Sequence, residues 1–184
     1  MGGKPAYIEY VNPTQINLLA PDLEPGPAQI TVTDPVGTSM TFTVAATTYG
    51  PAFFQWPNHQ PVATRQDFSY AVKTGTFQGV ITVPAKPGDV IILWGTGFGP
   101  TSPAVAAGAV VPSDQTYATP TLPTVAINNV PATVYGAALA PGFAGLYQVA
   151  IQVPTSLTNG DWPVVATIGG APSPTGVLLT VQSQ

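Results

Sequence analysis

The sequence predicts an all-β protein that consists of immunoglobulin-like β-sandwich modules in tandem, with the first module incomplete. Three observations support this fold class: short segments in which apolar residues alternate with polar ones, turns that contain Gly and Pro, and an internal repeat. Of the 184 residues, 19 are Gly and 22 are Pro, and only 7% are charged. Proline recurs too often for a helical pattern of ten residues, and Ala137–Ala140 is the most helix-like patch.

The expected strands follow one another at short intervals along the chain. Residues 147–153 show the pattern most clearly, because every second residue there is large and apolar, which is typical of a strand with one buried face. Turn residues predict hairpins at Asp34–Gly37, Asn128–Asn129 and Gly169–Gly170. The other predicted strands are Tyr7–Val11, Gln15–Ala20, Ile30–Thr33, Thr41–Val44, Ala52–Gln55, Val90–Trp94, Val125–Ile127, Ala132–Tyr135, Val164–Ile168 and Val177–Val181.

The internal repeat sets the predicted domain boundaries. Lys4–Ile8 resembles Val130–Val134, and Gln15–Pro21 resembles Gln148–Pro154. Residues 1–48 therefore match only the back half of a first module, whereas residues 49–184 form a whole second one. The front half, represented in the second module by Lys86–Gly99, has no counterpart in the first. Because a sandwich core usually takes about seven strands, we expect the first segment to pack on the second module, on another chain or on residues outside this sequence.

Several motifs occur in an order that resembles a known family. They are Pro13–Asn17, Pro84–Asp89, Gly95–Pro100, Gly145–Val149, Pro163–Gly170 and Leu178–Gln182. Together they resemble the uncharacterised Solibacter-type C-terminal region of large exported proteins of soil bacteria, which has two immunoglobulin-like modules. Gly95–Gly99 also resembles IPT/TIG immunoglobulin-like domains. The resemblance implies a noncatalytic module, extracellular or at the cell surface, whose signal peptide would lie outside this sequence.

Composition excludes or disfavours several function classes. Four Lys and Arg residues cannot neutralise the phosphates that a nucleic-acid binder contacts. The densest apolar run, Val90–Trp94, is far shorter than the roughly 20 residues of a membrane span. With one His and no Cys, little acid–base or nucleophilic chemistry can be arranged. We expect no enzyme, no cofactor and no metal, although Asp22 and Glu24 leave calcium open.

Aromatic residues are the best candidates for binding. Trp56 and Trp162 lie beside turn residues, where an exposed indole could stack on a sugar ring. His59, the only histidine, lies in the same loop as Trp56 and is a weaker candidate for ligand contact. Trp94 lies on the same face of its predicted strand as Val90 and Ile92, so we expect it in the core.

Other conspicuous residues have a structural interpretation. Gly95–Gly99 follows a predicted strand, but no helix follows to hold a phosphate, so we expect a tight turn or a bulge. Asp34, Asp114 and Asp161 are expected to form turns through bonds to nearby backbone N–H groups.

The functional hypothesis is a noncatalytic extracellular module for spacing, docking or assembly of a larger exported protein. Its partners would be other domains of that protein or neighbouring copies, which strand addition across the incomplete module could join. The alternative is a carbohydrate-binding module that uses Trp56 or Trp162 to hold polysaccharide. A hydrolase is the third hypothesis and is disfavoured by the scarcity of acid–base groups.

Overall fold

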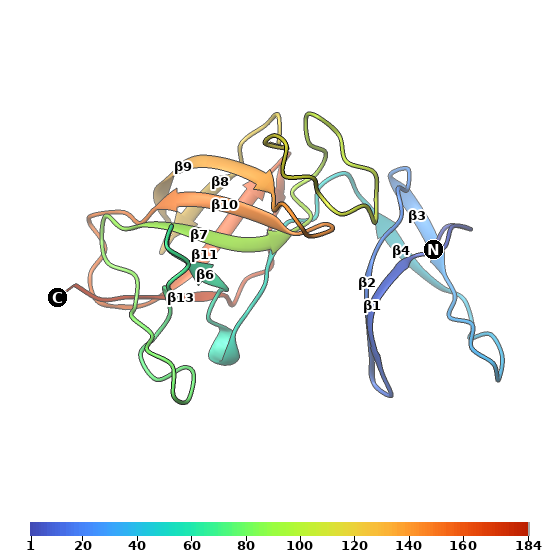
Figure 1. Ribbon diagram of the computed structural model, residues 1–184, viewed down its shortest axis with the longest axis horizontal. Coiled ribbons are helices and arrows are strands. Elements are labelled where there is room, and N and C mark those ends of the chain that lie inside the picture. The colour runs from blue at the N-terminus through green and yellow to red at the C-terminus, as the bar shows by residue number, and fades with distance from the viewer. Residues whose placement is uncertain (184) are drawn as a thin grey trace.

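The computed structural model describes residues 1–183 and shows an all-β chain built from antiparallel sheets (Figure 1). Within those residues the helical content is one short 3-10 turn, η1 (Pro57–His59). The strands are β1 (Tyr7–Asn12), β2 (Gln15–Leu19), β3 (Gly26–Ile30), β4 (Phe42–Ala46), β5 (Ala52–Phe53), β6 (Ala63–Thr64), β7 (Val90–Thr96), β8 (Thr124–Ile127), β9 (Val130–Leu139), β10 (Tyr147–Gln152), β11 (Gly160–Ile168), β12 (Ala171–Pro172) and β13 (Leu178–Val181).

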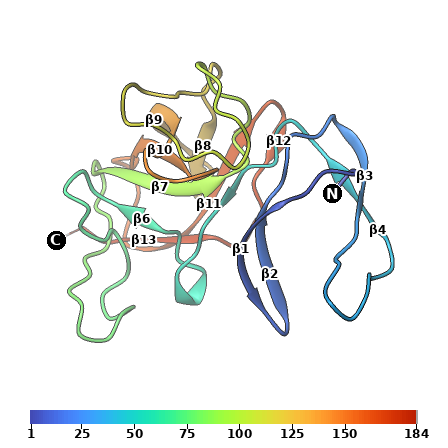
Figure 2. The ribbon, with the colours of Figure 1, turned by 45° about the vertical axis from the view of Figure 1, so that its right-hand side comes forward.

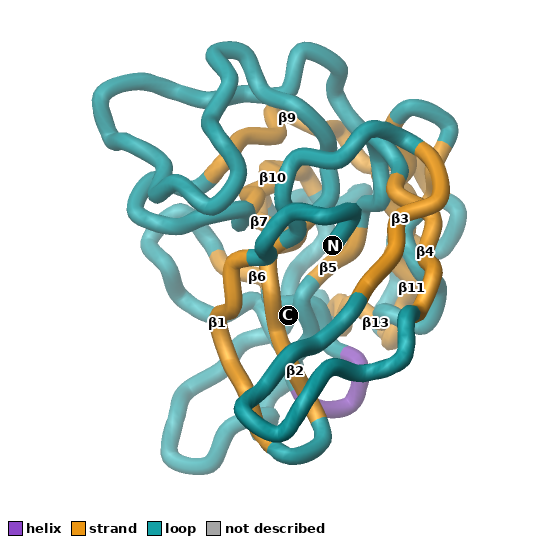
Figure 3. The backbone as a smooth tube through the Cα atoms, turned by 90° about the vertical axis from the view of Figure 1, so that its right-hand side faces the viewer, coloured by secondary structure: helices purple, strands orange, loops and turns teal. Residues whose placement is uncertain are grey.

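Residues 1–48, which we call the N-terminal arm, form two separate hairpins. β1 pairs with β2, and β3 pairs with β4, each as a two-stranded antiparallel sheet. Both hairpins project to one side of the remaining strands and therefore lie toward the viewer in Figure 3. They diverge from each other toward their turns (Figure 1). Asp34 closes the second hairpin as expected, because its carboxylate accepts hydrogen bonds from the N–H groups of Val36 and Gly37.

Residues 49–183, which we call the main body, contain a nine-stranded sheet. Its path runs β12-β11-β8-β9-β10-β7-β5, with β13 paired to β11 and β6 paired to β7. β9 connects two parts of this sheet, because its first residues pair with β8 and its later residues pair with β10. β7 is central, since β10 pairs with one edge of it and β5 and β6 pair with the other (Figure 2).

The core of the main body lies between the inward faces of these strands. Alternate residues are buried along β7, β10 and β11, so that Ile91, Leu93, Val149, Ile151 and Val164 belong to one apolar cluster. The prediction that Trp94 lies in this core is wrong. Its indole is on the opposite face of β7, where its Nε1 donates to the Thr64 hydroxyl at 2.9 Å.

Two local predictions also need correction, and the helix-like patch of the sequence forms a strand. The Gly169–Gly170 turn leads from β11 into the short β12, whereas β13 pairs with the beginning of β11. Ala137–Leu139 continues strand β9 and is not helical. The strand expected at Ile30–Thr33 ends at Ile30 and begins earlier, at Gly26.

The glycine-rich stretch after β7 is a place of close backbone approach. A Cβ at Gly97 would lie 1.9 Å from the carbonyl oxygen of Gly50, and Gly97 has a φ of +75°. The Gly50 N–H also donates to the Gly97 carbonyl at 2.9 Å. The segment that leaves the arm crosses here, and this close approach explains the glycine at position 97. The expected tight turn or bulge is not observed, because β7 continues to Thr96 with regular register.

Candidate functional site

Trp56 lies in an aromatic cluster just before η1. Its ring is nearly perpendicular to those of Tyr70 and Phe77, with centroid separations of 6.1 Å and 5.0 Å. The indole Nε1 is buried and has no hydrogen-bond partner within the described residues. Phe68 lies in the same loop region and is 69% exposed. The segment between β5 and β7 thus gathers aromatic rings. Of these, the sequence singled out Trp56 but not Phe68, Tyr70 or Phe77.

His59 and Trp162 do not join this cluster. His59 is exposed, and its Nδ1 lies 3.3 Å from the Gln55 side-chain oxygen. Trp162, on β11, packs against the core of the main body and donates its Nε1–H to the Thr158 carbonyl at 2.8 Å. Its ring also lies over Gly160, where a Cβ would approach it to 2.8 Å. Each of these contacts covers part of the Trp162 indole.

A polar contact that the sequence did not predict joins the loop before β7 to β11. The Lys73 ammonium lies 2.7 Å from a carboxylate oxygen of Asp161, and the Thr180 hydroxyl lies 2.5 Å from the other oxygen. These two hydrogen bonds hold the pKa of Asp161 below its ordinary value. The carboxylate is therefore an anchor between segments, and the prediction that Asp161 forms a local turn is wrong.

A metal centre finds little support in the described part of the chain. Across residues 1–183, no group of three or more His, Cys, Asp or Glu side chains could hold an ion. Near the two acids considered for calcium, the Lys4 ammonium instead donates to the backbone carbonyl of Asp22 at 2.6 Å.

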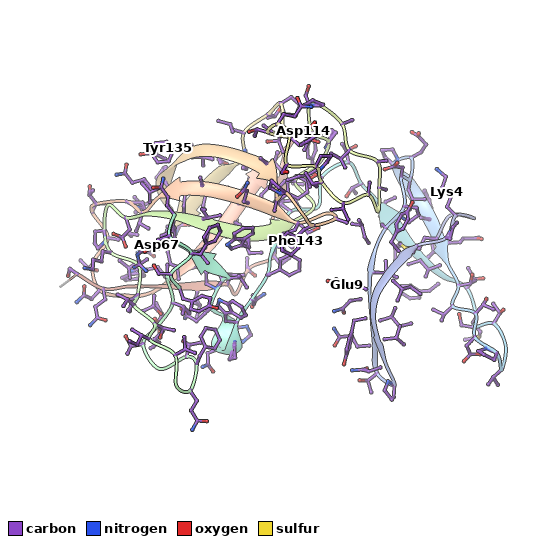
Figure 4. The ribbon with its side chains drawn as sticks, viewed as in Figure 1. Lys4, Glu9, Asp67, Asp114, Tyr135 and Phe143 are labelled. Atoms are coloured by element: carbon purple, nitrogen blue, oxygen red, sulfur yellow. The ribbon has the colours of Figure 1, made fainter. Side chains whose placement is uncertain are left out.

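The N-terminal arm carries a continuous apolar face that is open to solvent. Ile8 pairs with Leu18, and Val11 pairs with Ile16, so that the four side chains share one face of the β1–β2 hairpin. They are exposed by 64%, 39%, 59% and 37% respectively. Side chains project from both sides of this hairpin in Figure 4, where Glu9 marks β1 and Phe143 marks the end of the main body nearest to it.

The same strand pair occurs in the main body with matching register. The pairing of Ile8 with Leu18 corresponds, in the internal repeat, to that of Val134 with Ile151 in β9 and β10. A register shift follows at the same place in both hairpins, at Glu9 in β1 and at Tyr135 in β9. The repeat therefore extends from the sequence to the hydrogen-bonding pattern of the strands.

The environments of the two copies differ sharply. Ile16 and Leu18 of β2 correspond to Val149 and Ile151 of β10, which are 0% exposed. β10 pairs with β9 on one edge and with β7 on the other. β2 pairs with β1 only, so that, among residues 1–183, its second edge has no partner strand. Positions that form core in the main body thus stand at the surface of the arm.

Two glycine turns of the main body support the arm. A Cβ added at Gly108 would lie 2.3 Å from the Tyr7 ring, and one added at Gly145 would lie 2.5 Å from the Leu19 side chain. Both side chains of the arm therefore pack directly over glycines of the main body. A cleft of about 970 Å³ lies beside these contacts, between the ends of β2 and β4 and the loops of the main body. The ionisable groups that line this cleft are the Asp22 carboxylate, the amino group of Met1 and the Tyr147 phenol. This lining offers little acid–base chemistry.

Comparisons with known proteins add no further constraint. No protein family, curated protein or solved structure matches the chain. No helix within residues 1–183 is long and apolar enough to cross a membrane. The strongest candidate for a functional surface is therefore the open apolar face and free edge of the arm, with the Trp56 cluster as a second.

Proposed function

We propose that this chain is a noncatalytic extracellular docking module built from immunoglobulin-like β-sandwich modules in tandem. The main body is the complete module, and the N-terminal arm is the incomplete one, through which the chain contacts other domains of a larger exported protein. A single observation carries this proposal: Ile16 and Leu18 are about 40% exposed, whereas their counterparts Val149 and Ile151 are 0% exposed.

The physical argument rests on what exposed apolar surface and free strand edges do. Contiguous apolar patches on a protein surface mark interaction sites, because their burial is favourable. Free edges are usually protected by charge, by proline or by bulges that turn the edge away. β2 (Gln15–Leu19) carries neither charge nor proline, and the bulge of this hairpin lies on β1. Such an edge favours docking of a partner.

The scarcity of reactive groups favours a binding role over catalysis. The ionised side chains that hydrogen-bond across distant segments, such as Lys73 and Asp161, hold loops to strands. The extracellular setting follows from the resemblance of the ordered motifs to the Solibacter-type region of exported proteins.

Binding of the apolar dye bis-ANS tests the proposal. The wild-type chain should bind the dye with a rise in fluorescence, and the variant Ile16→Asn/Leu18→Asn should lose most of that rise. Tyr135→Ser is the matched control, because Tyr135 is 57% exposed but lies on the main body. Absence of dye binding, or equal binding by the wild type and the double variant, would refute docking through the arm.

The Trp56 cluster supports a second candidate function, namely carbohydrate binding. Tyr70, which packs against Trp56, is 37% exposed, and Phe68 in the same loop region is 69% exposed. Aromatic faces of this kind can stack on sugar rings. Calorimetry with soluble soil polysaccharides should then detect binding that Trp56→Ala abolishes. Trp162→Ala is the informative comparison, since that indole is already packed against the core. Binding that survives Trp56→Ala would remove this cluster from the site.

A further inference from the structure

We propose that the free edge of β2 binds an extended, apolar protein strand of the same chemical type as β7, in antiparallel orientation and in one defined register. This inference rests on the proposed docking function and names the partner of that surface. It begins from the β1–β2 hairpin, whose register and bulge match those of β9–β10. In the main body, the edge of β10 that corresponds to the free edge of β2 is occupied by β7.

The register of the bound strand follows from this correspondence. Leu93 of β7 lies opposite Val149, and Ile91 lies opposite Ile151. In the arm, these two apolar positions of an incoming strand would lie opposite Ile16 and Leu18. Both would then point to the face that is now exposed, and the unpaired backbone groups of β2 would gain ladder hydrogen bonds.

The distribution of charge distinguishes this partner from a second copy of the arm. The arm has one lysine and four carboxylates: Lys4, Glu9, Asp22, Glu24 and Asp34. Residues 49–96 have three cations, Arg65, Lys73 and Lys86, against Asp67 and Asp89. Two arms brought together would place like charges at one interface, whereas a strand flanked by cations would complement it.

The Lys73–Asp161 contact shows this complementarity in the main body. The lysine comes from the segment before β7, and the carboxylate comes from β11, which belongs to the later strands. Residues 97–183 otherwise contain Asp114 and no cation, so their charge has the same sign as that of the arm. In the main body, residues 49–96 therefore bring a lysine to a carboxylate of the later strands. We infer that a strand that docks on the arm likewise carries positive charge to an acidic surface.

The size of the exposed face also favours a strand over a flat dimer. Four partly exposed aliphatic side chains offer on the order of 400 Å² of apolar surface, which is about half of the ~800 Å² per partner in a stable protein interface. Strand addition compensates with main-chain hydrogen bonds. The β7 strand of a folded second copy cannot serve, because both of its edges are already paired. The donor is therefore a strand that is unpaired in its own protein.

The test uses the full chain and a labelled peptide with the sequence of residues 86–98, Lys-Pro-Gly-Asp-Val-Ile-Ile-Leu-Trp-Gly-Thr-Gly-Phe. Fluorescence anisotropy should show saturable binding, and hydrogen exchange should show new protection of amides in residues 15–19. The matched control peptide carries Ile91→Asp and Leu93→Asp, and it should bind at least about tenfold more weakly because it would bury charge.

Two variants of the chain locate the site. Leu18→Asp should weaken peptide binding by at least about tenfold, whereas Asn17→Asp, with the same charge on the other face of β2, should change it by less than about threefold. The proposal is overturned if the two peptides bind equally, if β2 gains no protection, or if light scattering shows that the chain alone dimerises through Leu18. Dye binding that depends on Ile16 and Leu18 without peptide binding would reject the strand partner and leave docking through the arm intact. Failure of both assays would reject both proposals.

Discussion

Truncation of Ile151 and of Leu18 to alanine should have very different costs, although the two residues hold equivalent positions in the repeat. Ile151 is 0% exposed and belongs to the core cluster of the main body. Ile151→Ala therefore removes buried methyl groups and leaves a cavity, which costs about 2–5 kcal/mol. Leu18 is already 39% exposed, so Leu18→Ala should lower the free energy of unfolding by less than about 1 kcal/mol.

Thermal and urea unfolding monitored by tryptophan fluorescence measure both effects. For a chain of this size, 1 kcal/mol corresponds to a Tm change of about 2–4 °C. We therefore expect Ile151→Ala to lower the Tm by about 10 °C and Leu18→Ala to lower it by less than about 4 °C. Ala150→Gly, at a half-buried position between the core residues of β10, reports the cost of disturbing the strand backbone alone.

The comparison can contradict the structural reasoning in two ways. If Leu18→Ala costs as much as Ile151→Ala, the apolar face of the arm is covered in solution and is not an open docking surface. If Ile151→Ala costs less than about 1 kcal/mol, the buried face of β10 does not contribute core packing of the usual strength.

Three other substitutions test individual contacts of the main body. Gly97→Ala should destabilise the fold by more than about 1 kcal/mol in a urea titration, because a left-handed backbone penalises a side chain and the new Cβ would lie 1.9 Å from the Gly50 carbonyl oxygen; an unchanged midpoint would contradict this. Burial raises the pKa of Tyr147, so its neutral phenol stabilises the fold below the unfolded pKa of about 10, and this stability is lost as pH rises through the folded pKa. Tyr147→Phe should therefore reduce the loss of Tm above about pH 10. The hydrogen bond from Lys73 lowers the pKa of Asp161, so the carboxylate stabilises the fold above the unfolded pKa of about 3.9, and this stability is lost as pH falls through the folded pKa. Asp161→Asn should therefore flatten the fall in Tm below about pH 3.9. At pH 7 the same substitution should change the free energy of unfolding by less than about 1 kcal/mol, because the pair is half-exposed.

The sequence predicted local features well because local residues determine them. The turn at Asn128–Asn129 forms as expected, since both residues adopt positive φ, at 53° and 60°. The internal repeat was also readable, because Gln15–Pro21 and Gln148–Pro154 share the alternation of a strand with one apolar face. The structure adds that these copies share register, which no local pattern specifies.

Features that depend on distant segments were not predictable. All five residues of Val90–Trp94 are apolar, so alternation could not say which face of this strand is buried. The contact between Lys73 and Asp161 joins residues 88 positions apart. In the candidate site, the sequence placed Trp56 beside turn residues, but it could not predict that Tyr70 and Phe77 pack around its ring.

The pairing between Ala85 and Val181 sets an order of events during synthesis. The Gln182 N–H donates to the Ala85 carbonyl at 2.9 Å, and β13 is the last strand along the chain that pairs with β11. The hairpins of the arm are local and can close soon after they leave the ribosome, yet isolated two-stranded hairpins are only marginally stable in water. At translation rates of about 5–20 residues per second, roughly 10–30 s pass between the emergence of β2 and that of residue 182. The rate of translation therefore determines how long the arm waits for the loops of the main body on which Tyr7 and Leu19 pack, whereas the second edge of β2 stays free even after the main body has folded.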